Sequence, residues 1–158
     1  GASAPGRQPA ARWRTGGPPA DGYVEPMPSS GDGERDLPRL LRDLDPRLGP
    51  DEVVFVVTPS VSDDVRPLAW VREDEGTTFV LPRADADRLG LPYTFVAAAI
   101  TLRVHSALDA VGLTAAVASA LSEAGISANV IAGYHHDHLF VPAHDARRAL
   151  EVLRALSS

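Results

Sequence analysis

The sequence predicts an α+β fold made of two βαββαβ units, with helices on one face of antiparallel sheets and the second unit lacking its last strand. Two observations lead to this prediction. From Glu52 the apolar patterns run strand, weak helix, strand, strand, helix, strand. From Ala99 they run strand, helix, strand, strand, helix, and the chain then stops. Connections in this order place helices on one face of an antiparallel sheet.

The first 35 residues differ in composition from the rest of the chain. They hold 6 of the 14 Pro and 7 of the 13 Gly, and they contain no Leu or Ile. Such a segment buries too little apolar surface to offset the entropy that is lost when it becomes ordered. We therefore expect a disordered Pro/Gly-rich tail over residues 1–35, an N-terminal unit over residues 36–92 and a C-terminal unit over residues 93–158.

The N-terminal unit begins with a predicted helix over residues 36–44, because Asp36 is a suitable N-cap and four Leu follow at helical spacing. The β-branched run EVVFVVT, residues 52–58, indicates a buried strand, and the polar PSVSDDV after it is weakly helical at best. PLAWVRE and TTFVLP lie on either side of Gly76 and predict a hairpin. A short helix then ends at Gly90.

The C-terminal unit shows clearer periodicity. Residues 93–105 predict one long strand or two successive strands, since apolar and polar side chains alternate in their second half. Residues 112–125 carry apolar side chains at helical spacing and end in Gly, which predicts a helix with a Gly stop. Strands are expected over residues 126–133 and 138–142. The last pattern, residues 143–156, is that of an amphipathic helix.

Composition and charge narrow the classes of function. The net charge of −6 and the pI of about 5.3 disfavour contact with phosphate backbones, so no nucleic-acid partner is expected. No apolar run approaches the ~18 residues of a membrane span, so no membrane partner is expected either. The chain has no Cys, which excludes disulfides, thiolate metal sites and a Cys nucleophile. A cytoplasmic location is the default expectation.

Residues 100–142, ITLRVHSALDAVGLTAAVASALSEAGISANVIAGYHHDHLFVP, resemble an ACT domain. The resemblance is carried by a strand, an Asp-x-x-Gly loop at Asp109–Gly112, a helix that ends in Ala-Gly-Ile, and a strand hairpin. The stretch REDEGTTFVLP, residues 72–82, strengthens it. Together these segments resemble the small bacterial tandem-ACT proteins of uncharacterised role, which are related to the ACT regions of cytosolic arginine sensors. The resemblance covers roughly residues 36–156.

The resemblance implies ferredoxin-like units that bind a small ligand, often an amino acid, at an interface between units. It implies a regulatory or sensor protein with no catalytic activity of its own and no cofactor, and a homodimer is the expected assembly. The chain departs from the family pattern in two respects. It shows no attached catalytic domain, and the last strand of its second unit is missing. The sheet edge left there must be covered by the first unit or by another chain.

A candidate ligand site follows from the stretch SALDAVGL, which joins a strand to a helix. The first amides of a helix lack internal partners and attract a carboxylate. Gly112 would allow a ligand close to the backbone, and Asp109 could accept hydrogen bonds from an ammonium group or act only as an N-cap. The hairpin that follows would supply the other wall. The candidate ligand-binding residues are Ser106, Asp109, Val111, Gly112, Leu113, Asn129, Gly133, Tyr134, His135 and His138.

The His-His-Asp-His run at residues 135–138 allows a second interpretation. It contains residue types that bind metals, and His105 at the end of the neighbouring strand could join them. Successive residues of a strand point to opposite faces, however, and rarely converge on one ion. We therefore expect no metal site and favour a polar hairpin beside a ligand pocket, with a metal-binding protein or metal-dependent enzyme as the alternative. No catalytic residue is expected, because His105 and Ser106 also point to opposite faces.

Overall fold

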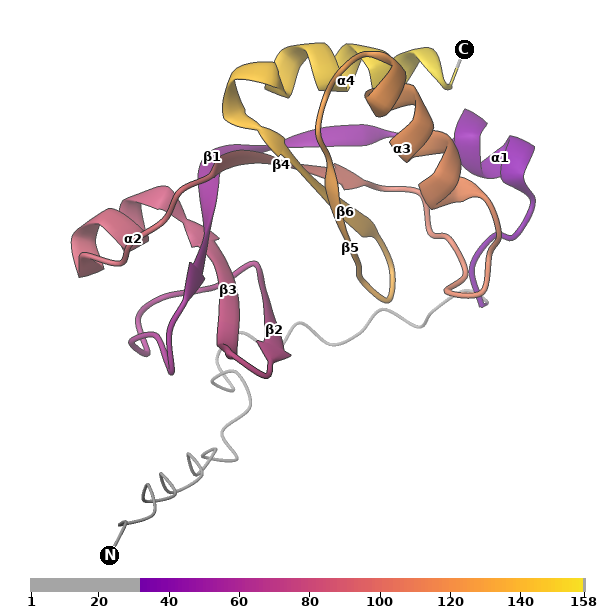
Figure 1. Ribbon diagram of the computed structural model, residues 1–158. Coiled ribbons are helices and arrows are strands. Elements are labelled where there is room, and N and C mark those ends of the chain that lie inside the picture. Colours follow the sequence, from indigo (N-terminus) through magenta and orange to yellow (C-terminus); the bar gives the residue numbers. More distant parts are fainter. Residues whose placement is uncertain (1–31, 158) are drawn as a thin grey trace, which may run out of the picture. The chain divides into compact units, whose positions relative to one another are not determined.

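The computed structural model describes residues 32–157, which form four α-helices and six β-strands (Figure 1). In chain order the elements are α1 (Leu37–Arg42), β1 (Pro46–Val57), β2 (Ala69–Glu73), β3 (Gly76–Pro82), α2 (Arg83–Leu89), β4 (Val96–Leu102), α3 (Leu113–Glu123), β5 (Asn129–Ala132), β6 (Asp137–Pro142), the short 3-10 helix η2 (Ala143–Asp145) and α4 (Ala146–Ala155). The polar stretch at residues 59–65 forms no helix.

Two strands differ in extent from their sequence patterns. β1 begins at Pro46, six residues before the apolar run that predicted it. Its first half contains two Pro and a Gly and lacks β-branched residues, so only its pairing with β4 identifies it as strand. β4 covers only the middle of the predicted 93–105 strand, because the residues on either side of it join the connecting loops.

The helices form where capping and apolar spacing agree. The N-cap carboxylate of Asp36 accepts a hydrogen bond from the amide of Arg39 over 3.2 Å and so begins α1. α3 buries Leu113, Val117 and Leu121, which lie one turn apart on a single stripe. These two features confirm the helix start and the buried stripe that the sequence predicted.

The strands form one antiparallel sheet in the order β2-β3-β1-β4-β6-β5. The strands β2-β3-β1-β4 make the sheet of the first unit, and β1-β4-β6-β5 make the sheet of the second. The two units therefore share the central pair β1 and β4 rather than sitting side by side. The α+β fold with two ferredoxin-like units is confirmed.

The place of the second unit's missing last strand is filled by the first half of β1. Residues 46–48 pair with residues 102–100 of β4, and residues 52–54 pair with residues 98–96. The register shifts between these two stretches, where β1 has a bulge at residues 49–51. The edge that needed covering is thus covered by the first unit, one of the two arrangements expected from the sequence.

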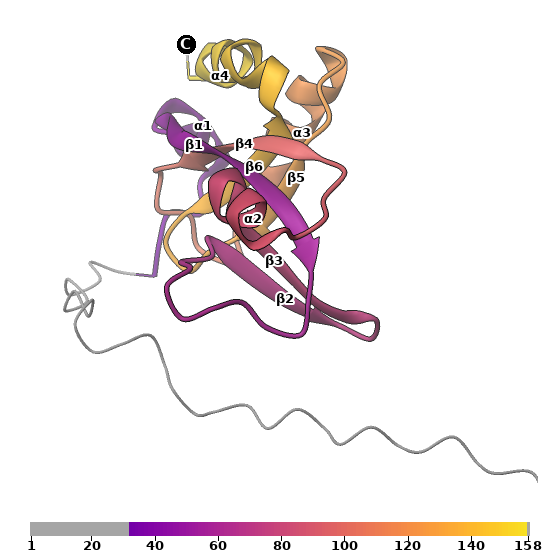
Figure 2. The ribbon, with the colours of Figure 1, turned by 90° about the vertical axis from the view of Figure 1, so that its left-hand side faces the viewer.

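All four α-helices lie on one face of the sheet (Figures 1 and 2). Strand alternation accounts for this arrangement, since the even-numbered residues of β4 contribute to the apolar clusters beneath both sets of helices. The cluster under α1, α3 and α4 is built from Leu40, Leu44, Ala98, Ile100, Leu102, Leu113, Val117, Leu121, Ile126, Leu139, Val141, Ala149 and Leu153. The cluster under α2 is built from Val54, Val56, Val65, Phe79, Leu81 and Ala86.

The face opposite α1 to α4 has an apolar cluster of its own. Ala97 and Ala99 of β4 are small, and they leave room for larger side chains from the strands on either side. Phe140 of β6 is fully buried there, and its ring meets the ring of Phe55 of β1 edge to face at 5.3 Å. Because β1 and β6 are separated by β4, this contact connects the two units across their shared strand.

No helix among the described residues is long and apolar enough to cross a membrane.

Candidate ligand-binding site

The segment 32–35 lies alongside the loop that follows β4. The amide of Glu34 donates to the carbonyl of His105 over 2.9 Å, and the amide of Ala107 donates to the carbonyl of Glu34 over 3.0 Å. The two segments form a short parallel bridge between Glu34 and Ser106. The sequence places residues 32–35 in the tail, whereas here they pair with the loop after β4. Residues 1–31 lie outside the described residues.

Gly33 makes this close approach possible. Its φ is +87°, a conformation that favours glycine, and a Cβ built on it would lie 2.5 Å from the backbone nitrogen of Ala107. Neither the backbone conformation nor the space admits a side chain, so glycine is needed at this position for segment 32–35 to dock on the loop.

Docking brings Arg35 to Asp109, 74 residues further along the chain. The Nε of Arg35 lies 3.0 Å from Oδ1 of Asp109, and its Nη2 lies 3.5 Å from Oδ2. The guanidinium therefore faces the carboxylate with two N–H groups. Both side chains are largely exposed, at 52% and 71%. In ordinary salt such an exposed pair contributes about 0–1 kcal/mol, so a competing ligand can replace it at little cost.

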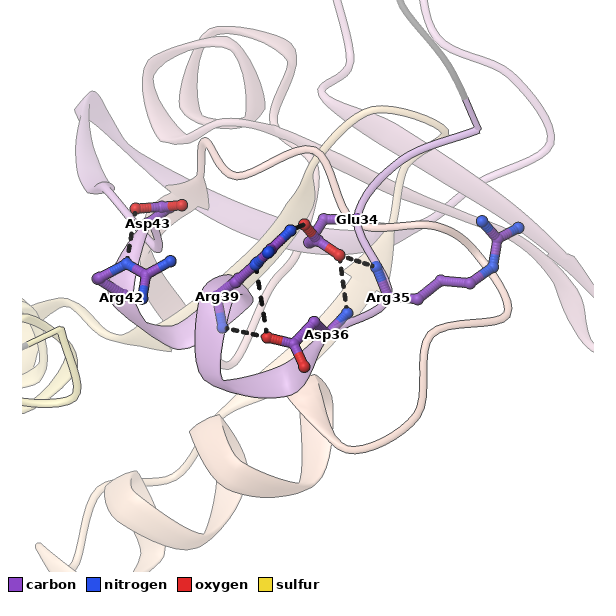
Figure 3. A network of polar contacts seen from close by, with 6 residues as sticks. All are labelled: Glu34, Arg35, Asp36, Arg39, Arg42 and Asp43. Atoms are coloured by element: carbon purple, nitrogen blue, oxygen red, sulfur yellow. Dashed lines mark hydrogen bonds and ion pairs between the residues drawn. The ribbon is translucent and has the colours of Figure 1, made fainter.

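Glu34 holds the backbone that carries Arg35 (Figure 3). Its Oε1 accepts hydrogen bonds from the amides of Arg35 and Asp36, over 2.8 and 2.9 Å, and Oε2 lies 3.6 Å from the guanidinium of Arg39. The hydrogen bond from Asp36, followed by that from Arg35, lowers the pKa of the Glu34 carboxyl. The segment entering α1 is thereby fixed by its own side chains as well as by the loop.

A cavity of about 240 Å³ lies beside the Arg35–Asp109 pair. Its walls come from three separate segments: residues before α1, the loop after β4, and the turn between β5 and β6. The lining residues are Asp32, Arg35, His105, Leu108, Asp109 and Tyr134. The cavity thus combines one guanidinium, two carboxylates, an imidazole and a phenol with the apolar side chain of Leu108.

Three rings stand together at one side of this cavity. The centroid of the His135 ring is 5.1 Å from that of His105 and 5.0 Å from that of Tyr134. Tyr134 is 65% exposed although it lines the cavity. A ligand side chain placed here would meet aromatic surface and ring nitrogens, so this side of the cavity can contribute to specificity.

The start of α3 lies close to the cavity, but its glycine does not face open space. Gly112 has a φ of +105° and is the N-cap of α3, with no side chain capping the helix. A Cβ on Gly112 would lie 2.9 Å from Cδ2 of Leu37, so α1 packs against the glycine on that side. Val111 is 84% exposed and Leu113 is buried. Contact between a ligand and the amides of residues 111–113 stays a prediction.

The remaining candidate residues lie outside the cavity. Asn129 pairs with Phe140 at the end of the β5–β6 hairpin away from its turn. The amide of Gly133 closes that turn by donating to the carbonyl of His136 over 2.9 Å. Ser106 belongs to the bridge with Glu34. Their roles toward a ligand, like that of His138, stay predictions.

The histidines of the hairpin have separate environments. Nδ1 of His138 lies 3.1 Å from the hydroxyl of Thr101, and Nδ1 of His136 lies 3.5 Å from the carbonyl of Val104. Among residues 32–157, no three His, Asp or Glu side chains come together in a geometry that could hold a metal ion.

The pKa values of His138 and Asp137 are shifted in opposite directions. Burial lowers the pKa of His138, and His136 lowers it further, while Asp137 raises it. Burial raises the pKa of Asp137, against the opposing charges of His138 and His136. Below its unfolded pKa, near 6.5, His138 binds protons more readily in the unfolded chain than in the folded one, so its contribution to stability is lost on acidification.

We expect His138→Gln to flatten the loss of stability that accompanies a fall from about pH 7.5 to about pH 5.5, a range in which histidine titrates. Urea unfolding of both proteins at several pH values measures the slope. His144→Gln is the matched control, because the side chain of His144 is 83% exposed. An unchanged slope in His138→Gln would assign the pH dependence to other groups.

Asp109 and Tyr134 were predicted and both line the cavity, and His135 stands beside them. Asp32 and Arg35 were missed because their segment has the composition of a tail. The one usable signal was Gly33 two residues before Arg35, and it carries no information about which segment it docks against.

Two family models together match residues 32–155. A family model described as an ACT domain matches residues 32–98, and a second ACT-domain model matches residues 96–155. The two matches meet within β4, the strand that both units share. No curated protein sequence matches the chain.

Solved structures show the same fold. A Vibrio cholerae protein of unknown function, described as a possible transport protein, is 44% identical over 77% of this chain and 96% of its own, with a TM-score of 0.69. An Agrobacterium tumefaciens protein is 17% identical, covering 71% and 87%, with a TM-score of 0.55. The ligand-free regulatory subunit of aspartate kinase from Thermus thermophilus is 9% identical, covering 70% and 95%, with a TM-score of 0.54.

Proposed function

Since the chain belongs to the ACT-domain family, we propose that it is a regulatory protein that senses an amino acid in the cavity beside the Arg35–Asp109 pair. ACT domains are regulatory domains that bind small molecules. The observation that carries the proposal is that one cavity is lined by an exposed guanidinium and by two carboxylates. These are the groups that an α-carboxylate and an α-ammonium group require.

The binding mode follows from the charges. The Arg35 guanidinium donates to the ligand carboxylate, and Asp109 or Asp32 accepts from the ammonium group. Because the Arg35–Asp109 pair is exposed and weak, a ligand that bonds both partners gains more than it displaces. The rings of His105 and Tyr134 then face the ligand side chain. The first amides of α3, at residues 111–113, supply additional positive potential.

Binding an amino acid at this cavity should depend on both charges. We expect Arg35→Gln and Asp109→Asn each to lower the affinity about tenfold or more, since a hydrogen bond to a charged group contributes roughly 1.5–3 kcal/mol. A thermal-shift screen over the amino acids identifies the ligand, because a ligand that binds only the folded protein raises its melting temperature. Calorimetric titration of wild type and variants then measures the loss.

The matched control is Arg47→Gln, which breaks an exposed ion pair with Asp45 elsewhere on the surface. Equal affinity in Arg35→Gln, Asp109→Asn and wild type, with all three folded, would move the site elsewhere. If no amino acid binds but zinc does, and His136→Ala and His138→Ala abolish zinc binding, the metal-binding alternative replaces the sensor.

Three large apolar side chains are exposed in the loop after β4 and in the β5–β6 turn, the segments that form two walls of the site. Leu108, Val111 and Tyr134 are exposed by 67%, 84% and 65%, and Leu108 and Tyr134 line the cavity. Exposed apolar groups gathered at one place commonly mark an interface. We therefore propose that the protein is a homodimer and that a second copy covers this surface, closing the cavity and linking ligand binding to assembly.

We expect Val111→Asp to shift the mass in light scattering from two chains toward the 16.7 kDa of one. A charge placed at a buried interface costs far more than the same charge at an exposed position. Val57→Asp is the control, because Val57 is 61% exposed on β1, away from the cavity. A wild type that scatters as one chain at micromolar concentration would contradict a stable dimer.

The other features of the proposed function are expectations from the sequence. We propose that the protein binds and does not catalyse, that it requires no cofactor, and that it acts in the cytoplasm.

A further inference from the structure

A second cavity, of about 340 Å³, lies on the face of β1 and β4 opposite α1 to α4 and shares no residue with the site described above. Most of its lining is apolar and comes from the β1 bulge, from the end of the loop before β2, and from β4. Its charged and hydroxyl-bearing residues are Asp51, Arg66 and Thr101. The volume is in the range of small-metabolite pockets.

The bulge in β1 gives this cavity its shape. Between Leu48 and Glu52 the strand leaves the regular register with β4, so residues 49–51 stand out of the ladder. Gly49 permits the close approach of the two strands, since a Cβ there would lie 3.2 Å from the carbonyl oxygen of Ala99. Bulges of this kind redirect side chains at binding sites.

Two opposite charges line the cavity without meeting each other. Within the described part of the chain, Asp51 forms no ion pair or side-chain hydrogen bond, and it is exposed. Arg66 uses one Nη1 N–H to reach the carbonyl of Asp63 over 2.7 Å, and within residues 32–157 it forms no ion pair. The other guanidinium N–H groups of Arg66 are therefore available to an acceptor.

The apolar part of the cavity has a buried base and an exposed rim. Val53 and Ala99 are 5% and 7% exposed, whereas Leu68 is 47% exposed although it lines the same cavity. Apolar surface left open between two unpaired charges suits a molecule with an aliphatic body and one charge of each sign.

We propose that this cavity is a second binding site, which takes a small aliphatic zwitterion such as a branched-chain amino acid. Arg66 donates to its carboxylate, Asp51 accepts from its ammonium group, and its side chain packs on Val53, Leu68 and Ala99. The site does not depend on the Arg35–Asp109 cavity, whose lining is mostly polar and would take a different side chain.

The test titrates the full chain with valine, isoleucine and leucine, and follows backbone amide signals by nuclear magnetic resonance. The amides of Val53 and Thr101 are expected to shift, and those of His105 and Asp109 to stay unchanged. Arg66→Gln and Asp51→Asn should each weaken the binding about tenfold or more. Isocaproate and isoamylamine, which each lack one charge of leucine, should bind more weakly than leucine. Arg47→Gln, which breaks an exposed ion pair with Asp45, should bind as wild type does.

Three outcomes overturn the proposal. The first is that none of the three amino acids shifts the amides of Val53 and Thr101 at millimolar concentration. The second is that Arg66→Gln and Asp51→Asn bind as tightly as wild type. The third is that Arg35→Gln abolishes the binding. The last result would assign these ligands to the Arg35–Asp109 cavity, so a failure of this second site is distinguishable from a failure of the first.

Discussion

Gly33→Ala is expected to release residues 32–35 from the loop after β4 and to remove ligand binding at the Arg35–Asp109 cavity. A Cβ at Gly33 would lie 2.5 Å from a backbone nitrogen, and the φ of +87° is unfavourable for alanine. The segment can relieve both only by leaving the loop, which breaks the two backbone hydrogen bonds made by Glu34. Because release relieves the strain, the loss comes from the two hydrogen bonds, at about 0.5–1.5 kcal/mol each, and lowers the free energy of unfolding by about 1–3 kcal/mol.

Hydrogen exchange at the Ala107 amide measures this release directly, because that amide donates to Glu34 in the wild type. Gly90→Ala is the matched control. Gly90 also has a positive φ, +64°, but nothing lies within 4 Å of a Cβ placed on it. The free energy of unfolding of Gly90→Ala should therefore fall only by the cost of the backbone conformation, about 1–2 kcal/mol, and this variant should bind ligand normally. Equal stability losses in the two variants, with Ala107 still protected, would show that the segment tolerates a side chain.

The order of strands and helices could be predicted because each element carries a local pattern. The stripe Leu113, Val117 and Leu121 and the stop at Gly125 identify α3 without any tertiary information. The first half of β1 could not be predicted in this way. PRLGPD has the composition of a turn, and it becomes strand only because β4 offers an unpaired edge that lies far away in the sequence.

The residues of the candidate site also divide into those with a local sequence signal and those placed by tertiary packing. Asp109 and Tyr134 were predictable because they stand in recognisable junctions, a strand-to-helix loop and a hairpin turn. Arg35 was not, because its place in the site depends on a glycine that fits against a loop 74 residues away. The contact between Gly112 and Leu37 of α1 is also tertiary and could not be predicted from the local sequence. Local sequence shows which residues can bind a ligand, and packing decides which of them are free to do so.

The shared central strands predict that the two units unfold together. β1 and β4 each belong to both sheets, so neither unit keeps its full set of backbone partners once the other is lost. A urea titration followed by far-ultraviolet circular dichroism and by amide signals from the β2–β3 and β5–β6 hairpins should give coincident transitions. Two separate transitions would mean that the shared pair does not couple the units.

Phe140→Ala is the variant in which this coupling should be most visible. Phe140 belongs to the second unit and is fully buried, yet its ring packs against Phe55 of the first unit across Ala97 and Ala99. Removing the ring should lower the free energy of unfolding by about 3–5 kcal/mol, the usual range for a buried Phe. The urea midpoints measured at both hairpins should fall by the same amount. Val57→Ala, at an exposed position of the same strand as Phe55, should change neither midpoint noticeably. A double-mutant cycle with Phe55→Leu and Phe140→Leu isolates the contact itself, for which an edge-to-face pair predicts about 0.5–1.5 kcal/mol of coupling. A midpoint that falls only at the β5–β6 hairpin would show that the second unit unfolds while the first remains folded.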